Sequence, residues 1–197
     1  MKRLFDFSAA LLGLLLVSPV LLAAAIAVRL DSSGPSFFRQ ERVGRGGKPF
    51  CILKFRTMTD GGSGPQITVG ADRRITRVGA FLRRTKLDEL PQLLNVLRGD
   101  MSLVGPRPEV PRYVAFYSPE DHRIVLSVRP GITDLASIRF HDESAVLARE
   151  ADPERAYVEK ILPRKLRLYR HYVRRQSLSY DIAIILKTLC VVAGERR

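Results

Sequence analysis

The sequence predicts an α+β protein that is mainly helical, with one small β-hairpin and an N-terminal membrane segment of the helix-break-helix type. Two observations carry this prediction. Residues 7–28 are uncharged and mostly apolar, and two strand-like runs, 36–43 and 49–56, flank a glycine-rich turn. Most of the remaining chain has apolar residues at helical spacing. A length of 197 residues allows one domain with a core, so we expect a re-entrant membrane anchor at 1–30 and a globular domain at 31–197.

The apolar stretch 7–28 would be roughly 33 Å long as a helix. A signal peptide fits its basic start and the small residues at 23–25, but the apolar run continues past them. A spanning helix fits by length. Basic residues stand on both sides, with Lys2 and Arg3 before the run and Arg29 after it. The positive-inside rule is satisfied when both ends lie in the cytoplasm, which favours a re-entrant hairpin.

Ser18 and Pro19 lie in the middle of this stretch. Pro19 removes the backbone hydrogen bond to the Leu15 carbonyl, and its ring presses against the preceding turn, so we expect a bend there. The Ser18 hydroxyl can bond to a carbonyl one turn earlier and offset part of that loss in lipid. The pair therefore predicts the break of a re-entrant hairpin, although an ordinary kinked spanning helix has the same signature.

The chain is strongly basic, with a formal net charge of +13 and a pI near 10.4. Such a balance calls for an acidic partner, which is nucleic acid, an anionic membrane surface or a phosphorylated ligand. The two cysteines, Cys51 and Cys190, are far apart and lack metal or redox spacing. We expect two buried thiols rather than a disulfide.

The predicted hairpin carries basic side chains. By the two-residue period of a strand, Lys54 and Arg56 lie on one face, where they would form a basic platform for phosphate groups. A solvated charged face has the same pattern. The polar, glycine-rich segment 60–65 that follows is a loop over an active site or a simple tether. Its spacing does not match the phosphate-binding P-loop.

The most informative residues are the adjacent carboxylates Asp88 and Glu89, which precede Pro91 and an apolar-periodic run. Proline is favoured in the first turn of a helix, so Asp88 and Glu89 are expected at or just before a helix N-terminus. At such a position Asp88 should stay ionised. Arg83 and Arg107 stand on either side. A nucleophilic carboxylate, a second one for a hard cation, and arginines for phosphate would form a phosphoryl-transfer set. Taken alone, two helix-terminal acids without chemistry remain the commoner interpretation.

Three further helices are expected in the second half. Residues 119–128 form a short helix and 153–175 a long, very basic one, separated by an extended crossing at 129–133. The apolar segment 180–192 is too short to span a bilayer. It lies in the membrane interface as an amphipathic helix or packs on the core, and the sequence leaves both open.

Seven segments, in order, make the chain resemble a small bacterial sugar transferase, that is, a monotopic phosphoglycosyl transferase reduced to its catalytic domain. They are KRxxD at 2–6, SP at 18–19, GPxFFxQxRxG at 34–44, KFRTM at 54–58, LDELPQL at 87–93, GDMSLVGPRP at 99–108 and RPGIT at 129–133. Each is weak by itself. In this order and spacing they are specific. They favour a catalytic role for Asp88 and Glu89 over the interpretation as helix-terminal acids without chemistry.

The resemblance implies transfer of a phosphosugar from a UDP-sugar to polyprenyl (undecaprenyl) phosphate with release of UMP. Asp88 would be the nucleophile of a ping-pong mechanism through a covalent phosphosugar–aspartate. Glu89 would be the Mg²⁺ ligand. Arg83 and Arg107 match the family's phosphate-facing arginines, and Lys54 matches its active-site lysine.

The resemblance also implies a location. Ser18 and Pro19 match the break that makes the family's membrane helix re-entrant, so the catalytic domain at 31–197 would face the cytoplasm at the bacterial inner membrane. The reaction would be the first membrane step of glycan assembly, which includes exopolysaccharide, O-antigen, capsule and glycoprotein pathways. The sequence does not choose among these pathways or among sugars, and it leaves a homodimer open.

Two features weigh against an unqualified transfer of function. The family's usual Gly-Leu-Ala-Gln after RPGIT is replaced by Asp134-Leu-Ala-Ser137, which bears on donor or packing. Two other kinds of protein also fit part of the pattern, a non-catalytic basic membrane-surface scaffold and a nucleic-acid-binding protein. No recognisable nucleic-acid motif is present, so no nucleic-acid partner is expected.

Overall fold

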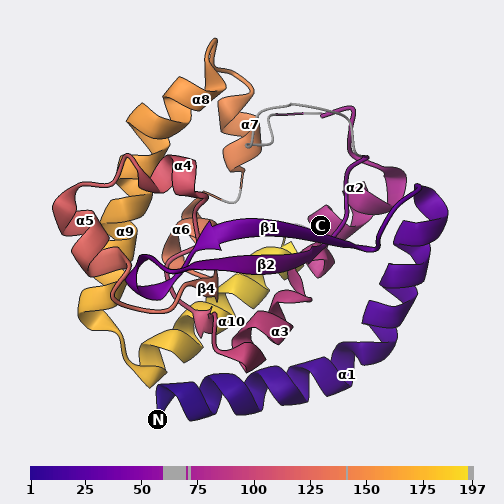
Figure 1. Ribbon diagram of the computed structural model, residues 1–197, viewed down its shortest axis with the longest axis horizontal. Coiled ribbons are helices and arrows are strands. Elements are labelled where there is room, and N and C mark those ends of the chain that lie inside the picture. The colour runs from indigo at the N-terminus through magenta and orange to yellow at the C-terminus, as the bar shows by residue number, and fades with distance from the viewer. Residues whose placement is uncertain (60–69, 71, 141, 195–197) are drawn as a thin grey trace.

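The computed structural model describes residues 1–59, 70, 72–140 and 142–194. It is mainly helical, with two small sheets at the centre (Figure 1). The glycine-rich segment 60–65 lies outside the described residues. The helices are α1 (Lys2–Asp31), α2 (Arg77–Arg84), α3 (Gln92–Arg98), α4 (Pro111–Val114), α5 (Pro119–Val125), α6 (Leu135–Arg139), α7 (Glu143–Leu147), α8 (Pro153–Ala156), α9 (Leu162–Arg175) and α10 (Leu178–Gly194). Short helical turns are η1 (Arg45–Gly47), η2 (Leu87–Glu89) and η3 (Tyr157–Ile161).

The predicted hairpin is confirmed. Strands β1 (Phe37–Val43) and β2 (Pro49–Phe55) pair antiparallel around a turn whose Gly46 and Gly47 have positive φ angles of 67° and 77°. Glycine is favoured there because a Cβ atom is strained in this backbone region. A second, parallel pair joins β3 (Ser102–Val104) to β4 (Gly131–Thr133). Of this second sheet, only the β4 segment was predicted, as part of the extended crossing at 129–133.

Helix α1 is bent part-way along, so that its two halves run along two sides of the molecule (Figure 1). Pro19 lies inside it, and the Ser18 hydroxyl donates to the Leu15 carbonyl at 2.9 Å. Pro19 has no N–H to donate to this carbonyl. The Ser18 hydroxyl therefore supplies the hydrogen bond that the proline removes, as expected. By length and composition α1 is the one helix in the described residues that is long and apolar enough to cross a membrane.

The start of α1 is fixed to the body of the protein by buried polar contacts. Lys2 Nζ lies 2.5 Å from the Asp181 carboxylate of α10. The Asp6 carboxylate accepts from the Ser102 hydroxyl at 2.9 Å and from the Leu103 N–H at 3.2 Å. We call Lys2, Asp6 and Asp181 the N-terminal clamp.

The end of α1 is fixed as well. The Arg56 guanidinium donates to the carbonyls of Ser32, Ser33 and Gly34, which follow the helix, and it is only 4% exposed. Arg56 Nη2 also lies 3.5 Å from the Val28 carbonyl in the last turn of α1, so this side chain ties the end of the helix to the segment after it. Asp31 in turn accepts from the first turn of α2, at the Val78 N–H, 2.9 Å away. Both ends of the apolar helix are therefore held by one body.

Two helices present apolar side chains to the outside. On α1 the exposed leucines and other large apolar residues include Leu4, Leu11, Leu12, Leu15, Leu16, Leu22, Ile26 and Leu30. Helix α10 has a shorter exposed set (Leu178, Ile182, Leu186 and Leu189). The largest core lies elsewhere, among α4, α5, α6, η3 and α9, around buried tyrosines such as Tyr113, Tyr157 and Tyr169. The expectation of buried thiols is wrong, because Cys51 and Cys190 are both exposed.

Candidate active site

Asp88 lies in η2, immediately before α3, as predicted. The chain reaches this turn through Lys86, whose φ angle of 56° is the one positive value among the described non-glycine residues. Helix α3 buries Leu93 and Val96 against the inner side of α1 around Ala10. This packing fixes the turn in front of α3 and leaves the Asp88 side chain 8% exposed.

Glu89 is the centre of an ion cluster. Lys54 of β2 donates to Glu89 Oε1 at 2.8 Å. Arg107, which follows β3, donates to both carboxylate oxygens, at 3.2 Å to Oε2 and at shorter range to Oε1. The hairpin, η2 and the β3 segment therefore bring Lys54, Glu89 and Arg107 together, as the sequence predicted for these three residues.

Arg83 approaches the same turn from α2. Its Nε donates to the Thr57 hydroxyl at 2.9 Å, and Nη2 lies 3.3 Å from the sulfur of Met58. Helix α2 packs against the η2 turn, and the positive charge of Arg83 opposes the rise in the pKa of Asp88. The predicted phosphate-facing arginine is thus beside the predicted nucleophile.

Arg56 does not join this group, which corrects the prediction of a shared basic platform with Lys54. The Arg56 N–H still donates to the Ser36 carbonyl at 2.9 Å, next to the end of β2, so the backbone continues the strand pairing, but the two side chains have different partners. Lys54 turns to Glu89, whereas Arg56 is buried at the end of α1 and donates to backbone carbonyls. In this structure Arg56 holds the end of α1 and lies outside the ion cluster around Glu89.

The two neighbouring carboxyls have opposite pKa shifts. Burial, together with the charge of Glu89, raises the pKa of Asp88 from 3.8 to about 6, against the opposing effect of Lys54, Arg83 and Arg107. Burial also acts on Glu89, but Arg107 and Lys54 outweigh it and hold the pKa of Glu89 well below its usual value. About nine-tenths of Asp88 is ionised at pH 7. Asp88 is therefore still mainly ionised at neutral pH, as expected, although its pKa is raised and not lowered.

Two buried polar atoms in this turn have no hydrogen-bond partner among the described residues, Asp88 Oδ1 and Gln92 Nε2. Asp88 and Gln92 are four residues apart on a helical backbone and so lie on one face. Buried polar atoms are almost always paired in folded proteins. Gln92, which is 1% exposed, was not singled out from the sequence. The spacing of four from Asp88 is the signal that would have found it.

The carboxylate pair fits a magnesium ion only with help from a substrate. No group of three or more His, Cys, Asp or Glu side chains that could hold a metal occurs in the described part of the chain. Mg²⁺ is commonly held by one or two carboxylates together with substrate phosphates. Asp88 Oδ1, which has no hydrogen-bond partner in the described part of the chain, is one such oxygen. The Glu89 oxygens are the other candidates and are now paired with Lys54 and Arg107.

Comparison with known proteins identifies the family. A sequence model described as bacterial sugar transferase matches residues 1–195. The chain belongs to the bacterial sugar transferase family. The prediction of a transferase of this family is confirmed, and the match includes the Asp88 turn, the ion cluster around Glu89 and the whole of α1.

Named relatives cover nearly all of this chain. A UDP-glucose:undecaprenyl-phosphate glucose-1-phosphate transferase from Caulobacter vibrioides is 42% identical over 195 residues, 95% of this chain and 68% of the relative. The protein of that name from Escherichia coli is 40% identical over 96% of this chain but only 39% of its own length. An Aeromonas hydrophila UDP-N-acetylgalactosamine-undecaprenyl-phosphate N-acetylgalactosaminephosphotransferase is 39% identical, over 95% of this chain and 42% of the relative. The chain thus spans about two-fifths of two of these relatives.

Proposed function

We propose that this protein transfers a phosphosugar from a UDP-sugar to polyprenyl phosphate and releases UMP. The observation that carries the proposal is the buried Asp88 carboxylate beside three cationic side chains, Lys54, Arg83 and Arg107. One Asp88 oxygen has no hydrogen-bond partner within the described ranges. The relatives are named for the same class of donor and acceptor. Because they differ in the sugar they are named for, the donor sugar is left unassigned.

In the first half-reaction, an Asp88 oxygen attacks the phosphorus that bears the sugar. A bond forms between Asp88 and phosphorus, and the bond from this phosphorus to the bridging oxygen breaks. The electron pair leaves with that oxygen on UMP. The product is a phosphosugar–aspartate. Attack requires the ionised carboxylate, which predominates at neutral pH because the pKa of Asp88 is about 6.

In the second half-reaction, a phosphate oxygen of polyprenyl phosphate attacks the same phosphorus. The bond to Asp88 breaks, the carboxylate is regenerated, and the sugar leaves on a polyprenyl diphosphate. Splitting one displacement into two allows a soluble donor and a lipid acceptor to use the same site in turn.

The cationic side chains would hold the phosphate oxygens in both half-reactions. Arg107 and Arg83 offer guanidinium forks, which bind phosphate well, and Lys54 offers a compact charge. Asp88 and Glu89 are the residues that would hold Mg²⁺, which supplies neutralisation of the diphosphate charge when bound. Arg107 and Lys54 now pair with Glu89, so binding of the diphosphate would redistribute these contacts.

We infer that α1 enters the inner membrane as a re-entrant hairpin and leaves residues 31–197 on the cytoplasmic face. Its bend, its exposed apolar side chains and the attachment of both ends to one body support this topology. A straight helix that crossed the bilayer would place its ends on opposite sides. A hairpin also keeps the Asp88 turn at the depth of a lipid phosphate. Cysteines placed at residues 2 and 32, in a background with Cys51 and Cys190 replaced by Ser, should label from the same side.

Labelling of those two positions from opposite sides would mean a spanning helix. The native cysteines must be replaced first because both are exposed and would react with the label.

The decisive experiment isolates the first half-reaction. The protein is incubated with each of several UDP-sugars and Mg²⁺ in the absence of lipid acceptor, and its intact mass is measured. A phosphosugar should add to Asp88, and Asp88→Asn should give neither the adduct nor UMP release. Turnover without an adduct would exclude the covalent route. Absence of UMP release with every donor, with polyprenyl phosphate present, would favour a non-catalytic scaffold. RNA binding that survives high salt better than turnover does would favour a nucleic-acid-binding protein.

A further inference from the structure

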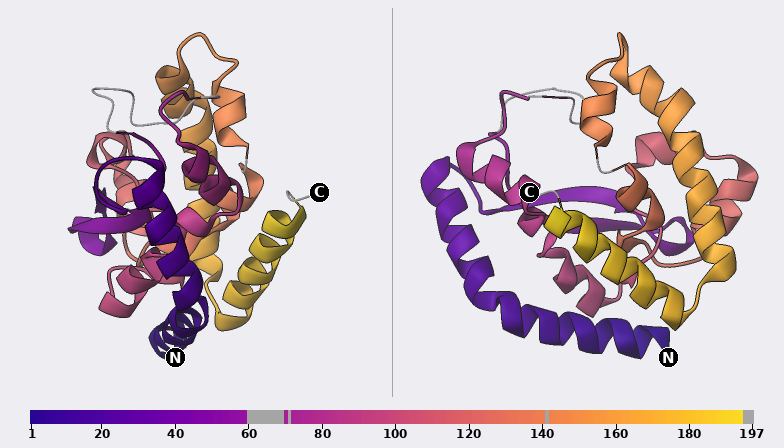
Figure 2. Two further views of the ribbon diagram at one scale, coloured as in Figure 1. Left: turned by 90° about the vertical axis from the view of Figure 1, so that its right-hand side faces the viewer. Right: turned by 180° about the vertical axis from the view of Figure 1, so that it is seen from behind.

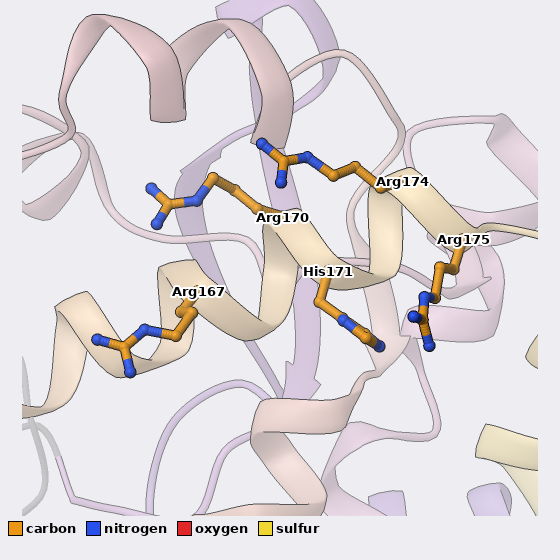
Figure 3. A pocket seen from close by; sticks show the side chains of 5 residues that line it. All are labelled: Arg167, Arg170, His171, Arg174 and Arg175. Carbon is orange, nitrogen blue, oxygen red and sulfur yellow. The ribbon is translucent and has the colours of Figure 1, made fainter.

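The outer face of α9 carries a cluster of basic side chains outside the Asp88 site. They line a hollow of about 340 Å³ and project from successive turns of one helix (Figure 3). Their spacing of three or four residues places them on neighbouring parts of the helix surface. The cluster, which we call the α9 basic face, consists of Arg167, Arg170, His171, Arg174 and Arg175.

Only part of this charge is neutralised within the protein. Arg170 pairs with Asp121, and Arg174 lies 3.3 Å from Glu120, both in the first turn of α5. Arg167 and Arg175 have no ion pair with any residue in the described ranges, and Arg175 is exposed. The α9 basic face therefore offers two uncommitted guanidinium groups beside two that α5 holds in place.

The α9 basic face adjoins an apolar surface. Helix α10 begins at Leu178, three residues after Arg175, and its exposed Leu178, Ile182, Leu186 and Leu189 recur at helical spacing. The ring of His171 lies edge-on to that of Tyr180, with 6.5 Å between centroids, so this side of α9 faces the start of α10. Seen from behind, α10 begins close to the N-terminal end of α1 (Figure 2).

Basic side chains on α9 are followed by an apolar stripe on α10, which is the arrangement expected at a membrane interface. An apolar stripe that lies among acyl chains puts the residues just before it at the depth of lipid phosphates. Guanidinium groups bind phosphate oxygens with two parallel hydrogen bonds. We propose that the α9 basic face binds the phosphate group of an anionic phospholipid of the phosphatidylglycerol type. The adjoining apolar stripe favours a lipid over a nucleic acid, which would meet leucines there. This site shares no residue with the Asp88 site.

The test uses the full-length protein in detergent, titrated with a soluble short-chain phosphatidylglycerol and, separately, with the matching phosphatidylcholine. We expect the anionic lipid to bind at least tenfold more tightly. Arg167→Gln with Arg175→Gln should weaken its binding by about 25-fold, or about fivefold for each charge removed. Unchanged melting temperature and unchanged UMP release without added lipid are expected, since neither arginine contacts another described charged group or the Asp88 site.

The matched control removes two exposed arginines elsewhere, Arg39→Gln with Arg149→Gln, and should weaken lipid binding less than twofold. Equal loss in both double variants would overturn the proposal, because only net charge would then matter. If inorganic phosphate at equal concentration displaced the lipid, the α9 basic face would be a site for free phosphate and not for a lipid. If an RNA oligonucleotide bound more tightly than the lipid and depended equally on Arg167 and Arg175, that result would overturn the lipid proposal and make the α9 basic face a nucleic-acid surface. Failure of lipid binding would leave UMP release unaffected, so the two proposals are tested separately.

Discussion

The Asp88 turn and the N-terminal clamp are both buried carboxylate sites, yet they differ in how completely their oxygens are paired. In the clamp, Asp181 accepts from Lys2 at 2.5 Å and from the Tyr172 hydroxyl at 2.6 Å, and both Asp6 oxygens also have partners. In the turn, one Asp88 oxygen has none among the described residues. A fully paired buried carboxylate stabilises a fold, whereas an unpaired one is available for a ligand or a reaction.

Asp88→Asn tests the reactive side of this comparison and has the largest expected effect. The amide keeps the shape but is not a nucleophile, so UMP release should fall by about 10³-fold or more. The melting temperature should stay equal or rise, because the substitution removes the repulsion between two adjacent buried carboxylates. UMP release and thermal unfolding of the same preparation check both results. Turnover within tenfold of the parent protein would remove Asp88 from the chemistry.

Arg107 and Arg56 are both predicted from the sequence to bind phosphate, but their substitutions should have different effects. Arg107→Met removes a cation from the Glu89 cluster and should lower kcat/KM for the UDP-sugar by about 10²-fold. Arg56→Met removes the cap of α1 and should lower stability by about 2 kcal/mol while leaving kcat/KM of the folded protein within threefold. Steady-state kinetics and chemical denaturation distinguish the two. A loss of kcat/KM in Arg56→Met equal to that in Arg107→Met would return Arg56 to the site.

The N-terminal clamp should respond in stability rather than in chemistry. Asp181→Asn replaces a paired carboxylate by a neutral amide that faces the Lys2 ammonium, and it should cost about 2 kcal/mol. Asp6→Asn is the matched variant at the neighbouring carboxylate and should cost a similar amount. Adduct formation per folded molecule should be unchanged in both. A selective loss of adduct in Asp181→Asn would mean that the clamp also positions the reactive turn.

The pH dependence is the smallest effect and bears on Asp88 alone. Its pKa of about 6 lies above the usual aspartate value of 3.8, so the carboxyl is protonated in acid and unreactive. The rate of adduct formation should fall about twofold from its plateau at pH 6 and about tenfold at pH 5. By linkage, the raised pKa makes Asp88 favour folding in acid, and this contribution is lost as the pH rises through 6. A flat rate between pH 5 and 7 in single-turnover measurements would contradict the assignment.

Local patterns predicted a large part of this structure. The hairpin, the bend of α1 with the Ser18 hydroxyl bond, and the position of Asp88 in front of a helix all follow from spacing within a few residues. Arg56 was misplaced because its side chain donates to carbonyls 22 to 24 residues away at the end of α1, a contact that strand alternation cannot predict. Gln92 was missed because its burial depends on packing against other elements.

Contacts between distant parts of the chain were out of reach. Nothing local to Lys2 or Asp181 indicates that they meet, and the second, parallel sheet joins segments that are each only three residues long. The family motifs include Lys2 and Asp6 but end at residue 133, so they gave no sign of Asp181 and did not distinguish clamp residues from site residues.

The pairing of Lys2 with Asp181 also has a consequence for the order in which the protein assembles. The two residues are 179 positions apart, so α1 emerges from the ribosome long before the α10 residue that holds it. During synthesis the apolar helix must therefore find its place in lipid without the clamp. Contacts between such distant residues form late and slowly in folding. The contacts of the clamp would then form last, after α1 has already entered the membrane.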